Sequence, residues 1–97
     1  MLIARVIGSA VSTIKSDKLS GLKLLIVQEA TPSNQLSETA PLIAADTVGA
    51  GEGELVIVVT GSSARLTPLT DGAPVDAAII GILDSLEVDR KTAFRKS

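Results

Sequence analysis

The stretch from Asp46 to Arg65 constrains the fold more than any other part of the chain. It contains three alternate glycines, Gly49, Gly51 and Gly53, followed by the aliphatic run Leu55–Val59. Glycine tolerates positive φ angles and close backbone approach, so these glycines predict a tight turn between strands. Consecutive aliphatic residues, mostly β-branched, are typical of a strand covered on both faces. Such a strand needs a second layer, supplied either by this chain or by another copy of it.

The composition favours a small domain that associates with other chains. The 97 residues suffice for a single domain spanning 1–97, and 45% of them are hydrophobic. A domain of this size buries only about 60–65% of the surface that its unfolded chain exposes. The apolar residues are almost all Ala, Val, Ile and Leu, with Phe94 as the one aromatic residue. This pattern predicts a tightly packed β core with apolar surface left over for partners.

The composition also argues against several classes of function. There is no cysteine, so neither disulfides nor thiolate chemistry is expected. Arg5 interrupts the N-terminal apolar run, and no apolar segment approaches the roughly 20 residues of a membrane helix. The net charge of −2 is spread along the chain, which argues against a nucleic-acid partner. A soluble cytoplasmic protein is expected, with no membrane or nucleic-acid partner.

The hydrophobic pattern predicts five strands and one helical turn. The strands are Met1–Ser12, Leu22–Ala30, Pro41–Ala45, Glu54–Thr60 and Val75–Asp84. A helical turn is expected over Ser63–Leu66, with the Ser62 hydroxyl as its cap. Ser85–Asp89 is a candidate extension of the fifth strand, Arg90–Thr92 a turn, and Ala93–Lys96 a short terminal strand. Five strands in a chain this short, without βαβ alternation, indicate an all-β barrel.

Two motifs resemble catalytic or phosphate-binding elements, but their context is wrong. A dinucleotide-binding glycine loop opens a helix, whereas a strand follows Gly49–Gly53, and Glu52 and Glu54 add negative charge there. A nucleophilic serine in Gly61–Arg65 would need a base, and the chain has no histidine. A Ser–Lys pair with Lys15, Lys18 or Lys23 is formally open, but nothing in the sequence supports it. No catalytic residue and no cofactor site are therefore predicted.

Three aspartates, Asp46, Asp76 and Asp84, lie at predicted strand ends. Carboxylates alone would favour Mg²⁺ or Ca²⁺, but their spacing matches no calcium-binding loop. No metal site is predicted. We expect each aspartate to cap a turn or to pair with Arg5 or Arg65 across a subunit contact.

Several segments, taken in order, resemble the EutN/CcmL family of pentameric vertex proteins from bacterial microcompartments. They cover most of the chain, and five of them in sequence are more specific than any one alone. The segments are Ala4–Lys15 (ARVIGSAVSTIK), Leu19–Val27 (LSGLKLLIV), Ala44–Val56 (AADTVGAGEGELV), Gly61–Arg65 (GSSAR) and Pro74–Asp84 (PVDAAIIGILD). Phe94–Lys96 also resembles the closing strand of the family. Leu55 departs from the family pattern, because many relatives carry tryptophan there. The loops 31–37 and 66–73 differ in length and content among relatives.

The resemblance implies an OB-like β-barrel that assembles as a cyclic homopentamer. Such pentamers cap the vertices of a polyhedral shell, in the cytoplasm, that is otherwise tiled by hexameric shell proteins, and they have no catalytic activity. Ser62 and Ser63 are then candidates for a narrow axial pore. Arg65 and Asp46 are candidates for an ion pair between subunits. The candidate interface residues are Asp46, Val48, Gly49, Gly51, Gly61, Arg65 and Asp76.

Two other functions are left open by the residues alone. One is a small OB-fold module that binds a nucleic acid or an anionic ligand through the C-terminal cluster Arg90, Lys91, Arg95 and Lys96. A solvated tail explains the same cluster. The other is an enzyme that uses lysine and aspartate, which would require a deep pocket where these groups converge.

Overall fold

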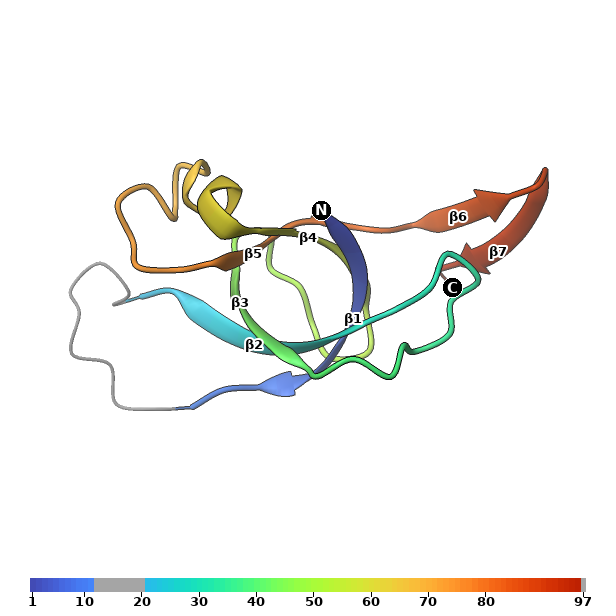
Figure 1. Cartoon of the computed structure of the whole chain (residues 1–97), viewed down its shortest axis with the longest axis horizontal. Helices are drawn as coiled ribbons and strands as arrows, with labels where there is room; N and C mark the ends of the chain where they lie inside the picture. Colours follow the sequence, from blue (N-terminus) through green and yellow to red (C-terminus); the bar gives the residue numbers. More distant parts are fainter. Residues whose placement is uncertain (12–20, 97) are drawn as a thin grey trace.

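Five strands close into a barrel in the computed structural model, which describes residues 1–11 and 21–96. The strands are β1 (Leu2–Ser9), β2 (Lys23–Glu29), β3 (Leu42–Asp46), β4 (Leu55–Thr60) and β5 (Ala77–Ile82). Their order around the barrel is β1-β2-β3-β5-β4, and Figure 1 shows the resulting ring of strands. All neighbours are antiparallel except β3 and β5, which run parallel. The predicted OB-like barrel is confirmed, while most of the segment between the first two predicted strands lies outside the described residues.

Alternation along the strands places one set of side chains inside the barrel. Small and β-branched residues fill this interior, since five strands leave little space at the centre. The buried cluster consists of Ala4, Val6, Leu25, Val27, Ala44, Ala50, Val56, Val58, Ala77 and Ile79, with Leu2 and Ile82 packed against it. Gly8 lies at a β-bulge of β1 opposite β2. The core is therefore aliphatic throughout, as the composition predicts.

The outer side of β4 is covered at both ends by other parts of the same chain. Val59 packs with Ala64, Ala78 and Val75 in a second buried cluster. At the other end of β4, Leu55 is buried and lines a pocket together with Phe94. Ile57, between them, is only partly buried. The predicted second layer thus comes from this chain at the ends of β4, and the middle of the strand stays partly exposed.

The helical turn begins two residues earlier than predicted. It is a 3₁₀ helix, η1 (Gly61–Arg65), with Thr60 at its N-cap and no side-chain cap, so the predicted capping by Ser62 is wrong. Gly61 has φ = 66°, which lets the chain turn directly out of β4 and start the helix at once. The buried Ala64 then holds the helix against the barrel.

The C-terminal segment is a separate hairpin, not an extension of the fifth strand. β6 (Ser85–Val88) pairs with β7 (Lys91–Arg95), and the hairpin projects away from the barrel (Figure 1). The predicted extension over Ser85–Asp89 is therefore wrong, and the terminal strand begins at Lys91 instead of Ala93. The two-residue turn Asp89–Arg90 has φ angles of 52° and 64°, a geometry that usually requires Asn-Gly. The molecule measures 45 × 24 × 23 Å.

Candidate functional site

Asp46 organises the turn that follows β3. Its carboxylate is buried, and Oδ1 accepts hydrogen bonds from the backbone N–H of Val48 at 3.1 Å and of Ala50 at 3.2 Å. Ala50 is itself buried in the barrel core, whereas the Val48 side chain is 39% exposed. Asp46 therefore caps this turn, and its side chain holds the backbone that presents Val48 to the surface.

The glycines of the turn have different reasons to be glycine. Gly49 and Gly53 adopt φ angles of 76° and 89°, which side chains with a Cβ rarely adopt. Gly51 has no such angle, but its N–H donates to Glu54 Oε1 at 2.6 Å, and an added Cβ would lie 3.4 Å from the same oxygen. The predicted tight turn between strands is confirmed.

Substitution of Gly53 by alanine should destabilise the protein by about 1–2 kcal/mol, because alanine is strained at a left-handed φ. Gly8→Ala is the matched control. Its added Cβ would meet Ile26 at an ordinary contact distance of 3.7 Å, and its φ is not left-handed. Urea denaturation of both variants at equal protein concentration measures the difference. Equal losses from the two variants would contradict the conformational argument.

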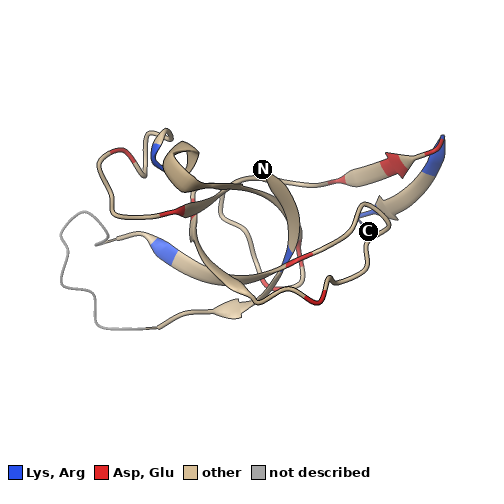
Figure 2. Cartoon of the chain, viewed as in Figure 1, with Lys and Arg blue, Asp and Glu red and all other residues tan. Residues whose placement is uncertain are grey.

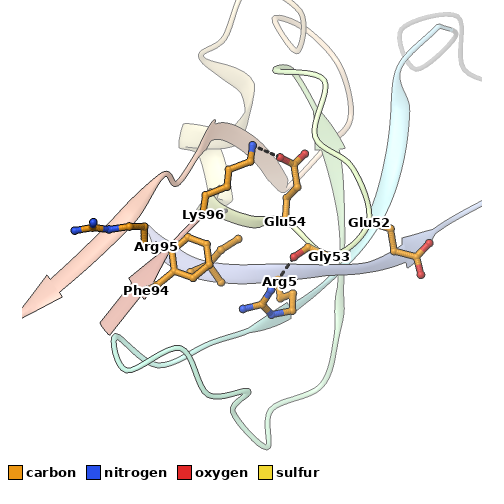
Figure 3. A pocket seen from close by; sticks show the side chains of 8 residues that line it. Arg5, Glu52, Gly53, Glu54, Phe94, Arg95 and Lys96 are labelled. Carbon is orange, nitrogen blue, oxygen red and sulfur yellow. Dashed lines mark hydrogen bonds and ion pairs between the residues drawn. The ribbon is translucent and has the colours of Figure 1, made fainter. Parts of the chain in front are cut away.

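Glu54 links the glycine turn to the end of the C-terminal hairpin. Its Oε2 forms an ion pair with Lys96 Nζ at 2.6 Å, while Oε1 accepts the Gly51 N–H. The backbone N–H of Lys96 also donates to the Asp84 carbonyl at 2.7 Å, which closes the base of the hairpin. Figure 3 shows this corner, a hollow of about 400 Å³ between the hairpin base and the glycine turn.

Arg5 lies across the same hollow, and among the described residues it forms no ion pair with an aspartate. Its guanidinium donates to the Gly53 carbonyl at 2.7 Å and to the Asn34 side chain. Within this chain its contacts are to a backbone and an amide oxygen, and its predicted pairing with a strand-end aspartate across a subunit contact stays a prediction. The arginine ties β1 to the glycine turn and to the connection between β2 and β3.

The ion pair of Glu54 with Lys96, which anchors the hairpin to the glycine turn, should weaken at acidic pH. The hydrogen bond from Lys96, and next that from the Gly51 N–H, hold the pKa of Glu54 below its usual value of 4.5. A depressed folded-state pKa adds stability above 4.5, and this contribution is lost as the pH falls through the folded-state value. We expect the hairpin to loosen only below about pH 4.5, measured by NMR titration of Glu54 and by amide exchange in β7. Lys96→Met should raise the pKa of Glu54 toward its usual value, while the Gly51 hydrogen bond keeps part of the depression. An unshifted Glu54 in the unmodified protein would contradict the anchor.

The other predicted residues gather at the opposite end of β4. The Gly61 N–H donates to the Asp76 carbonyl at 2.8 Å, and Arg65 Nη1 donates to the Val75 carbonyl at 3.1 Å. Ser62 and Ser63 are exposed on η1 beside them. The candidate residues thus form two groups, one around Asp46 after β3 and one around η1 after β4.

Isoleucines occupy the outside of every barrel strand, a feature that the sequence analysis missed. Cross-strand pairs place Ile3 beside Ile57 and Ile26 beside Ile43. The exposed fractions of Ile7, Ile43 and Ile80 are 41%, 56% and 37%. The available signal was the strand alternation itself, because outward positions that normally carry polar residues carry isoleucine here. An apolar outer face of this kind marks a surface for protein contact.

A groove lies where β3 and β5 separate at the start of both strands. β3 pairs with β2 at five register positions but with β5 at only two, Ala45 with Ala78 and Asp46 with Ile79. The groove has a volume of about 510 Å³. We call it the seam groove, lined by Pro41, Leu42, Ile43, Thr60, Gly61, Asp76 and Ala77.

The C-terminal cations lie on or beside the hairpin. Glu87 and Asp89 are interleaved with Arg90, Lys91 and Arg95, and Lys96 is paired with Glu54. Within residues 1–11 and 21–96, no group of three or more potential metal ligands comes together. Over the same residues, no helix is long and apolar enough to cross a membrane.

A closed five-strand barrel with aliphatic side chains on its outside defines an OB-like structural module suited to contact with other protein chains. The family model "Ethanolamine utilisation protein EutN/carboxysome" matches residues 1–84. The chain belongs to this EutN/CcmL family.

Curated relatives and solved structures agree with this assignment. The chain is 46% identical over 87 residues to the microcompartment shell vertex protein GrpN of Rhodospirillum rubrum, covering 90% of this chain and 97% of GrpN. It is 41% identical to the carboxysome shell vertex protein CcmL of Synechococcus elongatus, over 99% of this chain and 96% of CcmL. The structure of Gloeobacter violaceus CcmL superposes with a TM-score of 0.92 at 38% identity, covering 99% and 98%. The structure of GrpN, described as a pentameric shell protein, superposes with a TM-score of 0.81 at 44% identity. This match covers 91% of this chain and 99% of the GrpN chain.

Proposed function

We propose that this chain is a structural protein of a bacterial microcompartment shell, in which five copies form a ring that caps a vertex. The match to shell vertex proteins over nearly the whole chain carries the proposal. The protein has no catalytic role of its own. It lies in the cytoplasm, within a shell whose facets are hexameric shell proteins.

The distribution of apolar surface supports a closed ring. A cyclic assembly uses two different faces of each subunit, because the contact is head to tail. The barrel offers isoleucines on both sides, Ile3 and Ile57 on one and Ile26 and Ile43 on the other. The two groups of candidate residues, around Asp46 and around η1, likewise follow different strands, β3 and β4. We assign the interface to Asp46, Val48, Gly49, Gly51, Gly61, Arg65 and Asp76, and an axial pore to Ser62 and Ser63.

Arg65→Ala tests the interface assignment. Arg65 is exposed and reaches a backbone carbonyl within its own chain, so its loss should leave the barrel folded. A charge pair between subunits contributes about 1 kcal/mol per contact, repeated around the ring. Assembly should therefore shift to higher protein concentration, with unchanged circular dichroism. Arg65→Lys keeps the positive charge, so its assembly should shift less than that of Arg65→Ala. A variant that keeps the unmodified oligomer mass on dilution would remove Arg65 from the interface.

Shell closure tests the function itself. Co-expression with hexameric shell proteins should give closed polyhedral particles in the electron microscope, whose cargo resists added protease. Omission of this chain should leave open vertices and accessible cargo. Equal protection with and without the chain would contradict the vertex role.

A further inference from the structure

The β6–β7 hairpin carries apolar and charged side chains that its own barrel does not use. It lies beyond residues 1–84, which the family model matches. Its base is held by the Leu83 N–H to the Leu55 carbonyl and by the contacts of Lys96 with Asp84 and Glu54. Beyond the base the hairpin stands clear of the barrel, and Val88, near its tip, is 39% exposed (Figure 1).

Charge is divided unevenly between the hairpin and the rest of the chain. Four of the nine Lys and Arg residues lie between 90 and 96, whereas nine of the eleven acidic residues precede residue 85. The hairpin end is therefore net positive and the remainder net negative, and Figure 2 shows blue segments on the hairpin. Opposite charge on two parts of one chain favours contact between copies.

The seam groove has the complementary chemistry. Leu42 and Ile43 are 36% and 56% exposed at its wall, and Asp76 is exposed at its edge. Val88 lies between Glu87 and Asp89, and the next turn residue, Arg90, supplies the cation that can face the carboxylate beside the apolar wall. The groove and the hairpin are on opposite ends of β5, since Asp76 precedes the strand and Ser85 follows it. A hairpin directed away from its own barrel cannot fill its own groove.

We infer that the hairpin of each copy docks into the seam groove of the next copy, with Val88 against Leu42 and Ile43 and with Arg90 facing Asp76. This inference rests on the proposed ring and names the contact that links its subunits. Each subunit then gives a hairpin to one neighbour and receives one from the other, which is the head-to-tail arrangement that a closed ring requires.

Paired cysteine substitutions test the contact, because the chain has no cysteine of its own. Val88→Cys/Ile43→Cys should form disulfides between copies under mild oxidation, giving a ladder up to five chains on a non-reducing gel. A disulfide requires Cα atoms within about 7 Å of each other, so the ladder reports direct proximity. Val88→Cys/Leu69→Cys is the control, since Leu69 is 58% exposed but lies outside the seam groove and the assigned interface. A ladder from the control and none from the Ile43 pair would overturn the proposed groove.

A charge-reversal cycle provides the second readout. Arg90→Glu and Asp76→Lys should each raise the dissociation concentration of the ring about tenfold, and the double variant should recover most of that loss. Additive losses would overturn the pairing. The mass of the unmodified protein is measured first. If it is a monomer, the proposed ring fails; if it is a pentamer that gives no Val88–Ile43 link, the ring stands and the hairpin contact is wrong.

Discussion

Ile79→Ala should lower the free energy of unfolding by about 2–5 kcal/mol, the range for removing a large buried aliphatic side chain. Ile79 is fully buried in the barrel core and pairs across strands with Val58. The surrounding residues are held by strands on all sides, so the core has little freedom to close the cavity. Urea denaturation at a fixed protein concentration measures the loss, since subunit association also contributes to stability.

The adjacent Ile80→Ala provides the matched control. Its side chain faces outward and is 37% exposed, so the isolated barrel should lose less than about 1 kcal/mol. If the outer face is an interface, however, this variant should dissociate on dilution more readily than the unmodified protein. Similar unfolding losses at 79 and 80 would contradict the assignment of the two faces of β5.

Asp46→Ala should cost about 2–3 kcal/mol, because it leaves the buried Ala50 N–H without its acceptor and removes a second hydrogen bond to a charged group. The glycine turn would then lose its internal support, and assembly should weaken along with stability. Thermal denaturation and the oligomer mass are measured on the same sample.

Two further aspartate variants separate the loss of the capping hydrogen bonds from the loss of a carboxylate as such. Asp71→Ala removes an exposed carboxylate and should change stability by less than about 0.5 kcal/mol. Asp46→Asn keeps an acceptor oxygen at the turn. Its loss of stability should therefore lie between those of Asp46→Ala and Asp71→Ala. If Asp46→Ala proved as stable as Asp71→Ala, the capping role of Asp46 would be wrong.

The strands of the barrel were predictable because strand alternation and glycine turns are local signals. Leu55–Val59 indicated a strand covered on both faces, and Gly49 and Gly53 indicated the turn before it. The hairpin was not predictable in the same way, because Asp89–Arg90 forms its turn without glycine or asparagine at the second position. The start of η1 was misplaced since Ser62 looked like a capping residue, whereas the positive φ of Gly61 starts the helix earlier.

The candidate site was predictable in its parts but not in its arrangement. Motif order pointed to Asp46, Gly61 and Arg65, yet no local signal showed that they fall into two groups, one after β3 and one after β4. The ion pair of Glu54 with Lys96 joins residues 42 positions apart, so it depends on the closed barrel. The outward isoleucines could not be assigned from sequence, because alternation alone does not say which apolar face of a strand is the interior.

The central claim is that copies of this barrel close into a ring of five. Analytical ultracentrifugation or native mass spectrometry of the purified chain, over a dilution series, tests it directly. The account predicts a species with the mass of five 9.9 kDa chains that persists at micromolar concentration. A single species at the mass of one chain throughout the series would contradict it.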